Sequence, residues 1–78
     1  MRFGTAFWER RLDDRIEIIF RKYDLPYNEH YEKKKATVIS NCLREIQNNK
    51  ALEVELARSK NSLEFFVMQT IMYNIKEV

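Results

Sequence analysis

The last stretch of the chain, Ser62–Val78, is apolar on almost every side when it is drawn as a helix. Only Gln69 and Lys76 together make a clear polar strip along it. A helix that is apolar all round is normally buried by its neighbours. The stretch is too short to span a membrane, and Glu64, Gln69 and Asn74 interrupt its apolar run. We therefore expect the rest of the chain to pack around this helix.

The composition favours helices over sheets. The chain of 78 residues has one glycine and one proline, whereas the turns of an all-β domain need several of both. Charged residues make up 33% of the chain and hydrophobic residues 45%, which is typical of a folded protein. The length fits one helical domain, residues 1–78. The formal net charge of +2 permits an acidic partner but does not require one.

Two amphipathic helices are predicted ahead of the apolar stretch. Apolar residues recur at helical spacing along Ala6–Tyr23 and again along Glu29–Gln47. The break between them is set by Pro26, because the residue before a proline is pushed out of the helical conformation. The first helix should therefore stop by about Asp24. Asn28 is the expected N-cap of the second helix.

The region before the apolar stretch allows two interpretations. In the first, residues 48–49 end the second helix, Ala51–Ala57 forms a short third helix, and a turn follows at residues 59–62. Asn61 with Glu64 then has the pattern of a capping box. In the second, one helix runs from residue 51 onward, because neither glycine nor proline enforces a break. We favour the first. The predicted fold is all-α, a small antiparallel bundle of three to four helices around a buried C-terminal helix.

The sequence lacks the residue combinations that enzymes and metal sites need. With Gly4 as the only glycine, a glycine-rich phosphate loop is excluded. One histidine and one cysteine cannot make a Cys/His zinc site. His30 and Cys42 lie about 18 Å apart along one predicted helix, too far to act as a base and a nucleophile. Asp13 and Asp14 are interleaved with arginines, as in surface ion pairs. We expect a non-enzymatic protein with no catalytic residue, metal, cofactor or small-molecule substrate.

The N-terminus and the cysteine content bear on the compartment. A lone Cys42 cannot form a disulfide within the chain, which favours a reducing compartment. Glu9, Arg10 and Arg11 arrive before any apolar segment of a secretory signal. We therefore expect a cytoplasmic location and no membrane association.

Apolar residues left outside the predicted core point to a protein interface. Surplus apolar surface on a small domain often marks a partner site or a homodimer contact. The leading hypothesis is a small accessory or regulatory protein that docks on a protein partner or associates with a second copy of itself. Its candidate interface residues are Phe7, Ile18, Val54, Phe65 and Tyr73.

The alternative is a nucleic-acid-binding accessory protein. Basic residues gather on the first helix and at the start of the second, with tyrosines between the two groups. Basic side chains bind a phosphate backbone, and aromatic rings stack on unpaired bases. The candidate contacts are Arg10, Arg11, Arg15, Arg21, Lys22, Tyr27, Tyr31, Lys33, Lys34 and Lys35. This hypothesis predicts binding that weakens steeply with salt.

Overall fold

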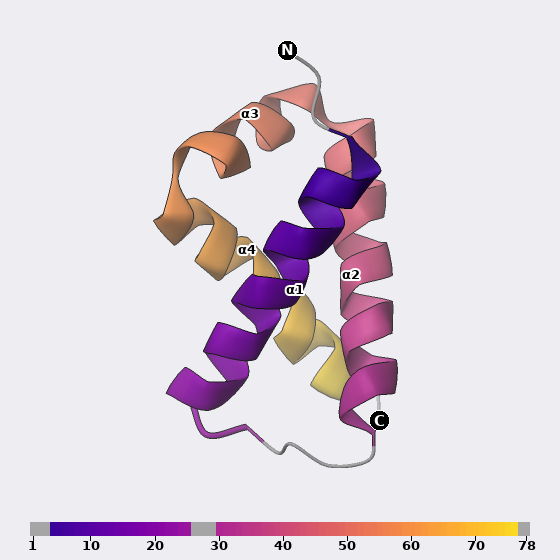
Figure 1. The fold of residues 1–78 in the computed structure, drawn as a ribbon, viewed down its shortest axis with the longest axis vertical. Coiled ribbons are helices and arrows are strands. Elements are labelled where there is room, and N and C mark those ends of the chain that lie inside the picture. The colour runs from indigo at the N-terminus through magenta and orange to yellow at the C-terminus, as the bar shows by residue number, and fades with distance from the viewer. Residues whose placement is uncertain (1–3, 26–29, 77–78) are drawn as a thin grey trace.

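Four helices make up the fold that the computed structural model describes, over residues 4–25 and 30–76. They are α1 (Thr5–Lys22), α2 (Tyr31–Asn48), α3 (Lys50–Arg58) and α4 (Lys60–Lys76). The three long helices pack on one another, with α1 and α2 antiparallel, and the short α3 joins α2 to α4 (Figure 1). The described residues contain no strand. The predicted all-α bundle is confirmed.

The end of α1 is fixed by its backbone hydrogen bonds. Asp24 adopts a positive φ of 53°, which is the left-handed conformation. The amide of Leu25 donates to the carbonyl of Phe20 at 2.9 Å, and the amide of Asp24 donates to the carbonyl of Arg21 at 3.4 Å. This pair of bonds is the Schellman motif that commonly closes helices. The predicted stop of the first helix by Asp24 is confirmed.

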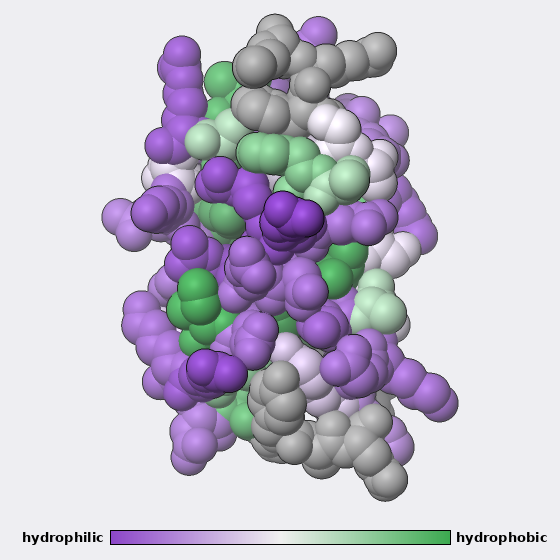
Figure 2. Space-filling view, in the orientation of Figure 1, coloured by the Kyte–Doolittle hydropathy of each residue, from purple (hydrophilic) through white to green (hydrophobic). Residues whose placement is uncertain are grey.

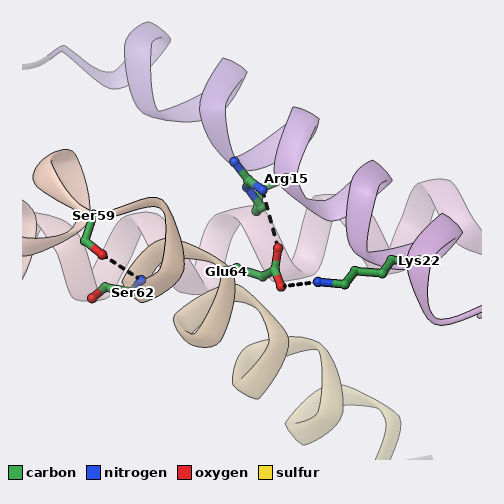
Figure 3. A network of polar contacts seen from close by, with 5 residues as sticks. All are labelled: Arg15, Lys22, Ser59, Ser62 and Glu64. Atoms are coloured by element: carbon green, nitrogen blue, oxygen red, sulfur yellow. Dashed lines mark hydrogen bonds and ion pairs between the residues drawn. The ribbon is translucent and has the colours of Figure 1, made fainter.

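Ser59 separates α3 from α4. Its backbone is extended, with φ of −126° and ψ of 117°, and its Oγ accepts a hydrogen bond from the amide of Ser62 at 3.2 Å (Figure 3). Asn49 caps α3 in the same way, accepting from the amide of Leu52 at 3.1 Å. The prediction of two helices in this region is confirmed. The capping box predicted at Asn61 is wrong, because Ser59 supplies the cap and α4 already includes Asn61.

The core is built from one side of each long helix and one residue of α3. On α4, Leu63, Val67 and Ile71 are buried, at the four-residue spacing that places them on one side. This helix contacts each of the other three, but Phe65, Met72 and Tyr73 on its other side are more than half exposed, so α4 is covered on one side and not all round as its sequence predicted. The other buried residues are Trp8, Leu12, Ile16, Ile19, Phe20, Tyr31, Val38, Cys42, Ile46 and Leu56.

Glu64 ties α4 to α1 through two cations. Its Oε1 lies 3.4 Å from Nη1 of Arg15, and its Oε2 lies 3.0 Å from Nζ of Lys22 (Figure 3). The hydrogen bond that Lys22 donates to Glu64 raises the pKa of Lys22 above its ordinary value. The side chains of Glu64 and Arg15 are 23% and 19% exposed, whereas those of the Glu17–Arg21 pair are 41% and 75% exposed. The pair with Arg15 is therefore less screened by water.

We expect Glu64→Gln to lower the free energy of unfolding by about 1–2 kcal/mol, because it leaves the partly buried Arg15 without a counter-ion. Glu17→Gln is the matched control on the exposed pair, where we expect a loss below about 0.5 kcal/mol. Urea unfolding followed by circular dichroism at neutral pH measures both. Equal losses in the two variants would show that Glu64 adds nothing beyond a surface pair.

Candidate protein-binding surface

The side of α4 that points away from the core carries the most exposed aromatic residues. Phe65 is 63% exposed, Tyr73 64% and Met72 53%. Gln69 is also exposed, and it lies between them on the same side of the helix, at the spacing of four and three residues that one helical side requires. We call these four residues the α4 face.

The α4 face has no charged residue along its length. Between Asn61 and Asn74 the only charged side chain is Glu64, and its carboxylate is directed to Arg15 and Lys22 of α1 (Figure 3). A helix side that faces water normally carries charged and polar groups. Exposed apolar residues without charges between them are instead typical of a surface that another molecule covers.

Two shallow grooves flank the α4 face. One lies between α2 and α4 and is lined by Arg44, Glu45 and Tyr73. The other lies between α3 and α4 and is lined by Glu55 and Phe65. Both grooves are lined by Phe66 and by Gln69 of the α4 face. Because they share these residues, both grooves lie on the same side of α4 and join the α4 face in one surface, on which aromatic rings lie among polar and charged side chains.

The outward side of α1 is apolar only in separate places. Phe7 and Ile18 are 36% and 44% exposed. Arg11 and Asp14 lie between them at helical spacing on the same side, and the Arg11 guanidinium lies 5.5 Å from the centroid of the Phe7 ring. The side of the molecule with α1 in front is largely hydrophilic, with separate apolar patches (Figure 2). Val54, on α3, is 46% exposed.

All five candidate interface residues are thus exposed, but they lie on three different helices. Phe65 and Tyr73 share the α4 face, whereas Phe7, Ile18 and Val54 lie on α1 and α3. Met72 was not among the candidates predicted from the sequence. Its position seven residues after Phe65, on the same side of the helix, was the signal that could have identified it.

Several basic candidates for nucleic-acid contact are held by acids of the same chain. The Nζ of Lys35 lies 3.0 Å from Oδ1 of Asp13, and this hydrogen bond raises the pKa of Lys35 above its ordinary value. Arg21 pairs with Glu17 at 3.0 Å. Glu64 holds two more of these cations on α1. Such ion pairs reduce the positive charge that a phosphate backbone would meet.

The expectation that Tyr31 stacks on a base is wrong. Its side chain is 2% exposed, because its ring packs edge-on against Phe20 with the centroids 4.9 Å apart. Tyr27, the other tyrosine among the candidates, and Asn28, the predicted cap of the second helix, lie outside the described residues. An exposed tyrosine is found instead at the end of α1, where the ring of Tyr23 lies 5.5 Å from Nζ of Lys22.

The remaining basic candidates lie in different places. Arg10 lines a groove between α1 and α2 together with Ile39 and Leu43. Lys33 and Lys34 lie in the first turn of α2. Arg10 therefore lies apart from Lys33 and Lys34.

Cys42 and His30 do not form a reactive pair. Cys42 is fully buried, and burial raises the pKa of its thiol to about 11. The thiol is therefore protonated at neutral pH, and a protonated thiol is a poor nucleophile. His30 is exposed at the start of α2. In the described ranges, histidine, cysteine, aspartate and glutamate do not form a group of three or more that could hold a metal ion.

Neither a membrane-spanning helix in the described residues nor a similar known protein indicates a function for this chain. Within residues 4–25 and 30–76, each helix is too short or too polar to cross a bilayer. Comparison with protein families, with curated proteins and with solved structures finds no match for this chain. The α4 face and its two grooves are therefore the candidate site.

Proposed function

We propose that this chain is a small non-enzymatic accessory or regulatory protein that acts by docking its α4 face on a protein. The observation that carries the proposal is the exposure of Phe65, Met72 and Tyr73 on a helix side without charges. Covering one fully exposed side chain of this size stabilises a complex by roughly 1.5–3 kcal/mol. Three such side chains on one helix side supply the apolar centre that stable protein interfaces have.

The chemistry of the α4 face fits recognition better than catalysis. It offers two aromatic rings, one of which carries a hydroxyl, together with a thioether and an amide. Aromatic residues and methionine are enriched at protein interfaces, and the flexible thioether of Met72 adapts to different contact shapes. The charged residues along the grooves, Arg44 and Glu55, can then orient the partner.

The test compares two exposed apolar residues on different helices. Phe65→Ser removes the aromatic ring from the α4 face, and Ile18→Ser makes the matched change on α1. At protein concentrations where the wild type is monomeric, we expect Phe65→Ser to weaken binding of an apolar fluorescent dye by roughly tenfold, because about 1.5 kcal/mol of apolar contact is lost. Ile18→Ser should leave dye binding unchanged. A monomer that binds no dye, or a loss confined to Ile18→Ser, would contradict the proposal.

A charge variant separates this proposal from nucleic-acid binding. The double change Lys33→Glu and Lys34→Glu avoids Lys35, whose ion pair with Asp13 holds α2 to α1. It should leave dye binding and self-association unchanged. If the protein instead binds labelled oligonucleotides in a strongly salt-dependent manner, and this double variant loses that binding, the nucleic-acid hypothesis is favoured.

A further inference from the structure

We infer that the molecule covering the α4 face is a second copy of this chain, packed antiparallel across a two-fold axis at Gln69. The inference rests on the proposed function of the α4 face and adds the partner and the geometry of the contact. Three features of the described residues support it: the spacing of the apolar groups, the residue at the centre, and the charges in the two grooves.

The apolar groups are arranged about the middle of the helix. Phe65 and Tyr73 lie on opposite sides of Gln69, each about 6 Å from it along the helix axis. Met72 lies next to Tyr73 and is 53% exposed. When two copies of α4 pair antiparallel about Gln69, Phe65 of each copy meets Met72 and Tyr73 of the other. A two-fold interface makes each contact twice. Phe65 at one end and Met72 with Tyr73 at the other end are therefore enough to give an apolar contact at both ends of the paired helices.

The residue at the centre suits a contact with its own copy. On a two-fold axis, each side chain near the axis faces the same side chain of the other molecule. Two carboxylates or two ammonium groups would repel each other there. A glutamine amide has both donors and an acceptor, so two Gln69 side chains can hydrogen-bond to each other. This pairing offsets the cost of burying an amide that would otherwise lack a hydrogen-bond partner.

The charges in the two grooves are complementary under the same pairing. Arg44 lies in the groove at the Tyr73 end of the α4 face, and Glu55 lies in the groove at the Phe65 end. Both grooves are on the same side of α4, so an antiparallel pair places Arg44 of one copy opposite Glu55 of the other, twice. Glu45 also lines the groove with Arg44, and the charge exchange described below tests whether Arg44 or Glu45 faces Glu55 of the other copy.

The first experiment is a charge exchange followed by sedimentation. We expect the wild type to sediment as a dimer, and Arg44→Glu or Glu55→Arg alone to raise the dissociation constant about tenfold or more, because like charges then face each other twice. The double variant, Arg44→Glu with Glu55→Arg, should return the dissociation constant to within about threefold of the wild-type value. Arg10→Glu is the matched control, because it reverses the same charge in the groove between α1 and α2 and should leave association unchanged.

The second experiment tests the position of the axis. In Gln69→Cys, the new thiol should lie beside its copy and form a disulfide-linked dimer under mild oxidation. The wild type controls for Cys42, which is buried and should not cross-link. Ile18→Cys, an exposed position on α1, should remain monomeric on a non-reducing gel.

The outcomes separate this inference from the proposed function. If the wild type stays monomeric while Phe65→Ser still lowers dye binding, a second copy of the chain does not cover the α4 face. The α4 face would then remain a site for another protein. A monomer without dye binding would overturn both. The antiparallel arrangement would be contradicted if the wild type is a dimer but two results fail. In that case the double variant at Arg44 and Glu55 would not recover the wild-type dissociation constant, and Gln69→Cys would not form a disulfide-linked dimer.

Discussion

Replacing Val67 with aspartate should unfold the whole protein. Val67 is fully buried on the inner side of α4. An unpaired carboxylate there costs several kcal/mol, and the lost apolar contact adds about 1.5–3 kcal/mol. A chain of this length has a total stability of about 4–12 kcal/mol. The expected loss is therefore comparable with the whole free energy of unfolding.

The matched control lies two residues away on the same helix. Phe65 is 63% exposed, so Phe65→Asp should keep the helical circular dichroism spectrum of the wild type. Cys42 gives a second measurement, because its buried thiol should react with a thiol reagent only after the core opens. Val67→Asp should lose the helical signal and react rapidly. A folded Val67→Asp with a protected thiol would show that the core has been assigned to the wrong side of α4.

Truncating Trp8 to alanine should remove about 3–5 kcal/mol of stability, the usual range for a large aromatic residue in a core. Trp8 is 2% exposed, and its indole Nε1–H donates to Oε2 of Glu53 at 2.9 Å. The side chain therefore fills the space between α1 and α3 and also joins them by a polar contact. Urea unfolding followed by circular dichroism measures the loss.

Trp8→Phe separates the packing from the hydrogen bond. It keeps an aromatic ring in the core but removes the donor to Glu53, so we expect a smaller loss of about 1–2 kcal/mol. If both variants lose the same amount, the hydrogen bond and not the ring is the main contribution. A loss below about 1 kcal/mol in Trp8→Ala would contradict the packing that the structure shows.

The helices and much of the core follow from local patterns in the sequence. The apolar spacing of α1 predicted its buried side, because spacing of three and four residues fixes which residues share a side. The break at Ser59 was harder to place. Neither glycine nor proline marks it, and both Ser59 and Asn61 are residue types that cap helices. The extended backbone of Ser59 decides between them.

The parts that sequence patterns missed depend on contacts between helices. The two cations that hold Glu64 lie on α1, which spacing within one helix does not reveal. Tyr31 is a different case, because its spacing to Val38 and Cys42 already places it on the buried side of α2. Its selection as a nucleic-acid contact disregarded that signal. By contrast, Phe65 and Tyr73 were predicted as exposed because they fell outside the apolar side that faces the core. Met72 was omitted because methionine is commoner in cores than at interfaces.

Sedimentation of the wild type and of Phe65→Asp over a range of concentrations tests the pairing of the α4 face most directly. We predict that the wild type shifts from monomer to dimer as its concentration rises. Phe65→Asp should stay monomeric over the same range with an unchanged circular dichroism spectrum, because a carboxylate then faces the apolar end of the other copy. A wild type that is monomeric at every concentration, or a Phe65→Asp that dimerises equally well, would contradict this account.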